Sequence, residues 1–197
     1  MNKEVIFDQI FTKLNGYSIS DEAKTNHKGS VEDILYGEVS LDTLKQILND
    51  VNKPLKGIFY DLGSGTGKAI IAAHLLNNFQ KYVGVELLKG LYDESLEVLN
   101  EYKKLSEQNC DNIVFENDDF LNTDLHDGGF ILINHPTVDR NIFKKLEQKM
   151  KKELKTNTII ITTIRQLEDK CFQELWSKKY KFSWGDSTIY VHKKNPV

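Results

Sequence analysis

Residues 59–68, FYDLGSGTGK, decide the fold, because an apolar run ends there in three closely spaced glycines. The residues from Ile58 to Asp61 are typical of a buried strand, and those from Lys68 to Leu76 are typical of a helix. Glycines let the backbone turn tightly and approach a ligand without a Cβ in the way. In an open α/β sheet, ligands bind at the carboxyl ends of the strands, where this turn falls. We therefore expect a strand, a ligand-binding turn and a helix.

Short apolar runs alternate with amphipathic segments through the rest of the chain. The other expected strands are residues 82–86, 113–116, 130–134 and 158–163, and the later expected helices are residues 91–107, 142–154 and 167–176. This alternation predicts right-handed crossovers and a parallel sheet covered by helices on both faces. Near the end, residues 180–184 and 188–192 flank Gly185-Asp186-Ser187, which predicts an antiparallel hairpin closed by a short turn. The expected fold class is α/β: a three-layer, Rossmann-like, seven-stranded sheet that is parallel except for the C-terminal hairpin.

The first 35 residues are expected to form an N-terminal helix and loop, ahead of a single domain at residues 36–197. Residues 5–14 have the spacing of an amphipathic helix, whereas residues 17–30 are polar and without a period, which is typical of a long loop. Ser40 is a suitable N-cap for a helix over residues 41–51.

The composition excludes several classes of protein. The 197 residues are 40% apolar, and their apolar runs fall far short of the roughly 18 residues that span a membrane. The N-terminal helix carries Glu4 and Asp8, so it does not have the uncharged core of a signal peptide. Cys110 and Cys171 form no Cys-x-x-Cys pair, so we expect neither a disulfide framework nor a thiolate zinc site, and no bound metal. These features favour an intracellular protein, cytoplasmic or nuclear.

The position of two acids identifies the expected cofactor. Glu86 lies nineteen residues beyond Gly67 at the end of the next expected strand, where a carboxylate meets the hydroxyls of a bound ribose. Asp61 stands two residues ahead of a Gly-x-Gly-x-Gly turn, whereas dinucleotide sites have Gly-x-Gly-x-x-Gly. A carboxylate there would repel a pyrophosphate but attract an ammonium group by roughly 1 to 4 kcal/mol. The sequence therefore predicts S-adenosylmethionine.

Two further strand ends are expected to complete the pocket. Asp118, Asp119 and Phe120 follow the third strand, where an acid can accept the adenine amino group and the ring can pack on the base. The alternative there is a solvated turn. Residues 134–137, Asn-His-Pro-Thr, follow the fourth strand, where the Asn134 carbonyl can accept hydrogen bonds from an amine nucleophile. The alternative for this stretch is a structural turn.

Several motifs in this order and spacing resemble one family, the non-SET histone lysine methyltransferases named for disruption of telomeric silencing. The motifs are Tyr36-Gly37-Glu38, Asp61 to Gly67, Gly84-Val85-Glu86, Asp119-Phe120, Ile133-Asn134, Ser183-Trp184 and Tyr190-Val191-His192. The similarity spans residues 36–192, so residues 36–197 are expected to be an S-adenosylmethionine-dependent methyltransferase domain. The first motif and the C-terminal hairpin are more specific than the glycine block, which many methyltransferases share.

The resemblance implies roles for individual residues. It implies that the loop at Tyr36 folds over the cofactor, and that Asn134 and Tyr190 border the channel for the lysine and act in catalysis. The implied cofactor-binding residues are Tyr36, Glu38, Asp61, Gly63, Ser64, Gly65, Gly67, Lys68, Glu86, Leu87, Asp118, Asp119, Phe120 and Asn134. The chain departs from the family at Lys68, where a glutamine is usual, at Val39, where a threonine is usual, and at residues 135–137, where the family has an aromatic channel wall.

We therefore expect methyl transfer from S-adenosylmethionine to a lysine of a protein substrate, with a histone as the first candidate. One alternative is a nucleic-acid amino-group methyltransferase, because residues 134–137 are similar to an Asn-Pro-Pro-aromatic motif. Another is a non-catalytic S-adenosylmethionine-binding subunit. The net charge of −3 does not favour a direct grip on nucleic acid without a partner, and no membrane partner is expected.

Overall fold

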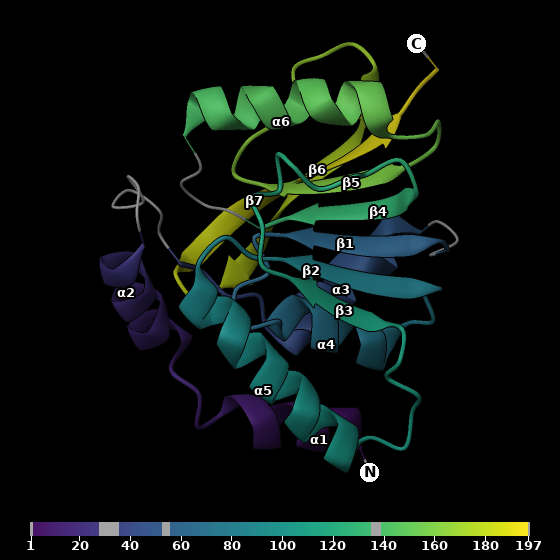
Figure 1. Cartoon of the computed structure of the whole chain (residues 1–197). Helices are drawn as coiled ribbons and strands as arrows, with labels where there is room; N and C mark the ends of the chain where they lie inside the picture. Colours follow the sequence, from purple (N-terminus) through teal and green to yellow (C-terminus); the bar gives the residue numbers. More distant parts are fainter. Residues whose placement is uncertain (1, 28–35, 53–55, 135–138, 197) are drawn as a thin grey trace.

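A computed structural model describes residues 2–27, 36–52, 56–134 and 139–196, and it contains one seven-stranded sheet (Figure 1). The strands are β1 (Ile58–Leu62), β2 (Lys81–Val85), β3 (Ile113–Glu116), β4 (Gly128–Ile133), β5 (Ile159–Thr163), β6 (Phe172–Phe182) and β7 (Gly185–Lys194). The helices are α1 (Lys3–Phe11), α2 (Gly16–Asn26), α3 (Leu41–Val51), α4 (Lys68–Leu76), α5 (Lys89–Leu105) and α6 (Arg140–Glu153).

The strand order places a ligand-binding edge beside β1. The order is β3-β2-β1-β4-β5-β7-β6, in which the first five strands are parallel and β7 is antiparallel to both β5 and β6. The strands following β1 in the chain lie first on one side of it and then on the other. Ligands bind at such a switch point, outside the carboxyl ends of the strands. The predicted Rossmann-like, mostly parallel sheet with an antiparallel C-terminal hairpin is confirmed.

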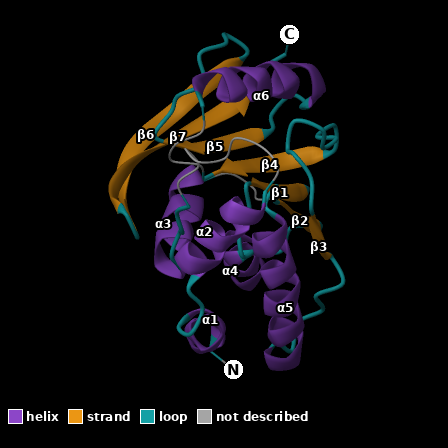
Figure 2. Ribbon diagram, turned by 60° about the vertical axis from the view of Figure 1, so that its left-hand side comes forward, coloured by secondary structure: helices purple, strands orange, loops and turns teal. Residues whose placement is uncertain are grey.

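Helices cover the two faces of the sheet unequally, as Figures 1 and 2 show. On one face, α6 packs against a core cluster that includes Leu62, Ile131 and Ile160. On the other face, α1, α3, α4 and α5 pack into a larger cluster built around Phe59 and Phe130. The sheet is therefore the middle of three layers. Within the described ranges, no helix has the length and apolar character needed to cross a bilayer.

Local signals fixed most element boundaries to within two residues. The expected helix over residues 68–76 and the expected strand over residues 113–116 have those bounds in the structure. Ser40 caps α3 as predicted, because its side chain accepts a hydrogen bond from the Thr43 amide, and α3 ends at Asn52 in a left-handed conformation. These signals depend on neighbouring residues only, which is why they could be interpreted from the sequence.

The prediction of a long loop over residues 17–30 is wrong for most of that stretch. Helix α2 occupies Gly16–Asn26, and Asn15 caps it by accepting a hydrogen bond from the Ser18 amide. The helix has no apolar stripe because it buries little, chiefly Ala23 against Gly90 of α5. A helix that makes so few apolar contacts leaves no 3.6-residue period in the sequence. Residues 28–30 lie outside the described residues, as does the predicted domain boundary at residue 35.

The prediction of a helix over residues 167–176 is also wrong. The second half of that stretch, residues 172–176, belongs to the long strand β6, which pairs along its length with β7. An irregularity in the register between Glu174 and Trp176 breaks the two-residue alternation, so the apolar spacing imitated a helix. The hairpin turn is shifted as well. Phe182 pairs with Gly185, so Ser183 and Trp184 form the turn, and the residues expected to turn belong to β7.

Candidate functional site

Three glycines in left-handed conformations form the turn between β1 and α4. Gly63, Gly65 and Gly67 have φ angles of 91°, 55° and 82°. The amides of Gly63 and Ser64 donate to the Val85 carbonyl at 2.9 and 3.0 Å, which binds the turn to the end of β2. A Cβ on Gly65 would lie 2.7 Å from the ring of Tyr36, closer than such atoms approach. Glycine is therefore required here both by the backbone conformation and by the close neighbour.

Asp61 and Glu86 lie buried at the ends of adjacent strands. The exposed fraction is 2% for Asp61 and 7% for Glu86. The Glu86 carboxylate accepts the amide of Gly65 at Oε2 and the amide of Leu88 at Oε1, both at 2.8 Å. The Asp61 Oδ1 atom accepts no hydrogen bond from the described part of the chain. Among the residues that the structure describes, neither acid forms an ion pair.

The electrostatics of this pair favour a positively charged ligand. Burial raises the pKa of Asp61 well above its usual range, and the charge of Glu86 raises it further. Burial also raises the pKa of Glu86, although the amides of Leu88 and Gly65 oppose the shift. A cation near both groups would stabilise their charged forms. A diphosphate would add negative charge to a site that already holds two acids.

Three buried polar atoms near this edge have no hydrogen-bond partner within the described residues. They are Asp61 Oδ1, Ser64 Oγ and Asn134 Oδ1, which come from the ends of β1 and β4 and from the glycine turn. An unsatisfied buried group costs about 1–3 kcal/mol, so a ligand or an ordered water usually completes it. The carboxylate and the amide carbonyl are acceptors, and the hydroxyl can donate or accept. This set fits a ligand that carries an ammonium group and hydroxyls, as S-adenosylmethionine does.

The Tyr36 segment, residues 36–38, lies across the glycine turn. The Tyr36 hydroxyl donates to Glu38 Oε1 at 3.0 Å and lies 3.2 Å from the hydroxyl of Thr66. Burial and the charge of Glu38 raise the pKa of Tyr36 far above its usual range, so its hydroxyl stays neutral. Asn134 Nδ2 donates to the Gly37 carbonyl at 3.3 Å. The segment therefore joins the carboxyl end of β4 to the turn that follows β1.

Lys68 connects the Tyr36 segment to the N-terminal helix. Its ammonium donates to Glu38 Oε2 at 2.7 Å, and both side chains are largely buried. The same ammonium lies 5.9 Å and 5.3 Å from the ring centroids of Phe7 and Phe11 on α1, within range of a cation–π interaction. The lysine that replaces the usual glutamine is therefore already engaged by protein groups.

The Ser183-Trp184 motif, together with Tyr17, which the sequence did not single out, holds the Tyr36 segment from the outside. Ser183 Oγ, at the tip of the β6–β7 hairpin, accepts the Glu38 amide at 3.3 Å and contacts the Tyr17 hydroxyl of α2 at 2.6 Å. The ring of Trp184 packs on Gly37, where a Cβ would lie 2.4 Å from it. These three stretches are far apart in the chain, so no local signal could reveal that Tyr17 and Ser183 meet.

The residues expected at the adenine are spread around the end of β3. Asp118 is exposed and accepts hydrogen bonds from the Asp119 amide and the Asn122 side chain. Asp119 accepts the Leu121 amide, and Phe120 is half-buried against the α6 side of the core. Leu87 packs with Tyr36 against the small cluster beneath α2. The structure brings these residues to the same edge as Glu86, while their contact with adenine stays a prediction.

Tyr190 lies further from the glycine turn than the other predicted residues. It pairs with Thr162 of β5, which in turn pairs with Ile133 of β4, so Tyr190 is two strands away from the strand that precedes Asn134. Its neighbour His192 is buried, and burial lowers the pKa of that histidine to about 4. The lowered pKa favours the neutral form of the His192 ring, whose Nε2 accepts the Leu167 amide at 3.4 Å. The predicted residues His135, Pro136 and Thr137 lie outside the described residues.

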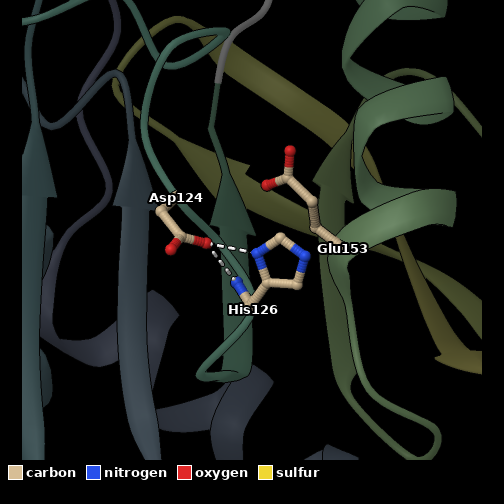
Figure 3. A group of neighbouring side chains, drawn as sticks. All are labelled: Asp124, His126 and Glu153. Carbon is tan, nitrogen blue, oxygen red and sulfur yellow. Dashed lines mark hydrogen bonds and ion pairs between the residues drawn. The ribbon is translucent and has the colours of Figure 1, made fainter.

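Figure 3 shows a group with the ligand types of a metal site away from this edge. Asp124 and His126 precede β4, and Glu153 ends α6, so the group sits at the amino end of the parallel strands. The Lys149 ammonium lies 2.7 Å from Glu153 Oε1, and His126 is hydrogen-bonded to Asp124. Lys149 already neutralises the Glu153 carboxylate, and we assign no metal to the group.

A family model and a curated relative that are similar to this chain point to the same family. A model described as "Histone methylation protein DOT1" matches residues 17–181. The histone-lysine N-methyltransferase of Caenorhabditis elegans that is specific for lysine 79 of histone H3 is 27% identical over 145 residues. That match covers 70% of this chain but only 15% of the longer worm protein.

Solved structures share the fold. An RNA methyltransferase from Salinibacter ruber, in complex with S-adenosyl-L-homocysteine, has a TM-score of 0.59 and 20% identity, covering 80% of this chain and 91% of that one. A putative RNA methyltransferase from Pyrococcus horikoshii has a TM-score of 0.66 and 15% identity, and covers 98% of both chains. At these identities, the similarity establishes the fold of this chain and does not identify a substrate.

Proposed function

Because this chain belongs to the DOT1 family of histone methylation proteins, we propose that it transfers a methyl group from S-adenosylmethionine to a lysine side chain of a protein. The family match over residues 17–181 is the observation that supports a protein lysine as the methyl acceptor. Family and fold both support S-adenosylmethionine as the methyl donor. A histone is the first candidate substrate, which corresponds to a nuclear site of action.

The residues at the carboxyl edge fit this cofactor. S-adenosylmethionine supplies a methyl group on a positively charged sulfur, which a neutral amine can attack. Asp61 would hold the ammonium of the methionyl group, and the free lone pairs of the Glu86 carboxylate would accept the ribose hydroxyls. The amides of Gly65 and Leu88 fix the Glu86 carboxylate in place before any ligand arrives. The Tyr36 segment would cover the site.

The protein's main task toward the acceptor is to align a neutral amine. A lysine ammonium has no lone pair, so it must lose its proton first, and an apolar environment lowers its pKa. Alignment alone can lower a barrier by about 7–11 kcal/mol. Asn134 Oδ1, which has no partner among the described residues, is an acceptor that can orient an N–H of the incoming amine. Tyr190 would border the channel from the side of β7.

The test is to incubate the protein with radiolabelled S-adenosylmethionine and, separately, core histones, nucleosomes, total RNA and a cell extract. We expect label in protein, released as methyl-lysine on hydrolysis. Label in RNA and in no protein band would refute the lysine acceptor. If calorimetry detects cofactor binding but no fraction takes up label, the chain is a binding subunit and not an enzyme.

Replacing Asn134 with alanine should separate cofactor binding from turnover. We expect kcat to fall roughly 10- to 100-fold, because the amine loses one orienting acceptor, while the Kd for S-adenosylmethionine changes little. Asn134→Asp is the matched variant, since it keeps an acceptor oxygen and removes the donor to the Gly37 carbonyl. Steady-state kinetics with calorimetry measures both effects. Wild-type turnover in Asn134→Ala would remove this residue from the catalytic set.

A further inference from the structure

The carboxyl end of β5 carries an exposed isoleucine in a strained backbone conformation. Ile164 has a φ of 68°, and 42% of the residue is exposed. A β-branched side chain clashes with the backbone in this left-handed region, so such residues are rare there. Strain of this kind persists only where the surroundings enforce it, and it is concentrated at functional sites.

The other left-handed positions of the described chain make Ile164 exceptional. Besides glycines, only Asn52, Asn157 and Ile164 have positive φ angles in the described ranges. Asparagine tolerates this conformation because its short polar side chain can hydrogen-bond locally. Asn157 precedes β5 and Ile164 follows it, so the two ends of one strand offer a direct comparison. The asparagine suits this conformation, and the isoleucine does not.

Hydrogen bonds hold the strained turn in place. The Ile164 amide donates to the Thr188 carbonyl of β7 at 2.8 Å, and the Arg165 amide donates to the Thr163 carbonyl at 2.7 Å. The hydroxyl of Thr162 donates to the Arg165 carbonyl. Thr162 and Thr163 are both buried. The conformation is therefore imposed by its surroundings, and the isoleucine remains exposed at a cost to stability.

The turn lies beside the residues expected at the acceptor. Ile133 of β4 pairs with Thr162, and the Thr163 hydroxyl donates to the Ile133 carbonyl at 3.4 Å. Asn134 follows Ile133, so Ile164 stands one strand over and one residue further toward the carboxyl edge. On the other side, Thr163 pairs with Ile189 of β7, next to Tyr190. In the strand order, Ile164 at the end of β5 therefore lies between β4, which precedes Asn134, and β7, which carries Tyr190.

We propose that Ile164 is a specificity-determining residue that packs against the aliphatic surface of the acceptor segment, including the methylene stem of the lysine. This inference rests on the proposed function. A neutral lysine presents four methylene groups before its amine, and an exposed isoleucine offers them an apolar wall that excludes water. Glycine at this position would relieve the backbone strain and so raise the stability. It would also remove the apolar wall and so weaken the binding of the acceptor.

The experiment compares Ile164→Gly with Ile164→Val, which keeps an apolar β-branched side chain. Acceptor is titrated at saturating S-adenosylmethionine, with core histones and with a cell extract whose methylated lysines are identified by mass spectrometry. For Ile164→Gly we expect the Tm to rise by about 2–4 °C, the cofactor Kd and kcat to stay unchanged, and the acceptor KM to rise about tenfold. Ile164→Val should retain most of the wild-type KM.

Two controls test whether the effect depends on position. Asn157→Gly changes the left-handed residue at the other end of β5, and Leu96→Ala removes another exposed apolar side chain, on α5. Neither should change the acceptor KM. A wild-type KM in Ile164→Gly, or a KM change equal to that of a control, would overturn the inference while lysine methylation by the wild type stands. If the wild type labels only RNA, the proposed function and this inference both fail.

Discussion

Replacing Asp61 with asparagine is expected to reduce the affinity for S-adenosylmethionine by at least about 100-fold and to make the ligand-free protein more stable. Removing one partner of a buried charge pair costs about 3–5 kcal/mol, because the other charge is left uncompensated. The gain in stability follows from the raised pKa of Asp61. Calorimetry and thermal unfolding of the same two proteins measure both effects.

The pH dependence has a definite sign. Because the pKa of Asp61 is higher in the folded than in the unfolded protein, its contribution to stability is full below the ordinary value of 3.8 and is lost as pH rises through the raised value. An asparagine side chain does not titrate, so Asp61→Asn should flatten this part of the stability curve. At neutral pH the ligand-free variant should gain about 2–4 °C in Tm, which corresponds to about 1 kcal/mol.

Asp111→Asn is the matched control. Asp111 is exposed and precedes β3, so it lies at the amino ends of the parallel strands, away from the site at their carboxyl ends. It should change neither the affinity nor the Tm. If Asp61→Asn binds S-adenosylmethionine as tightly as the wild type, or unfolds at a lower temperature, the electrostatic interpretation of the site is wrong.

Replacing Gly65 with arginine is expected to abolish cofactor binding and to leave a folded protein. Gly65 has a φ of 55°, and its amide donates to Glu86 Oε2. Even a Cβ there would lie 2.7 Å from the Tyr36 ring, so a longer side chain must displace that ring and fill the space above the turn. Binding by calorimetry and the far-ultraviolet circular dichroism spectrum distinguish a blocked site from an unfolded chain.

Gly57 provides the control for strain alone. It has a φ of 87° and precedes β1 at its amino end, but an added Cβ would meet nothing closer than 3.4 Å. Gly57→Ala should therefore lower the Tm through the left-handed backbone without changing the cofactor Kd. Gly65→Ala should lower both the Tm and the cofactor affinity, because it combines the same strain with the contact to Tyr36. Equal cofactor affinity in the wild type and Gly65→Arg would show that the pocket lies elsewhere.

The parts of the fold that were predictable from the sequence are those fixed by near neighbours. Three closely spaced glycines after an apolar run predict a strand, a turn and a helix. With Glu86 at the end of the next strand, they also predict where the cofactor binds, and neither prediction needs a long-range contact. The errors fell where a local pattern was absent or misleading. Helix α2 buries too little to show a helical period, and the irregularity near Glu174 gave a strand an apolar spacing that resembled a helix.

The rest of the site depends on contacts between distant segments. Glu38 with Lys68, Gly37 with Asn134 and Ser183 with Tyr17 are pairs separated by between 30 and 166 positions. The left-handed conformation of Ile164 likewise depends on its bond to Thr188. Residue type alone reveals none of these pairings, because each side chain has many possible partners until the topology is known.

The most direct test of the central claim is isothermal titration calorimetry of the wild-type protein with S-adenosylmethionine and, in a parallel cell, with NAD⁺. The claim is that the glycine turn, Asp61 and Glu86 form a site for a positively charged adenosyl ligand. We predict one S-adenosylmethionine bound per chain, with an affinity that falls as pH is lowered from neutral and Asp61 takes up a proton, and no binding of NAD⁺. Binding of NAD⁺, or no binding of S-adenosylmethionine at neutral pH, would contradict the claim.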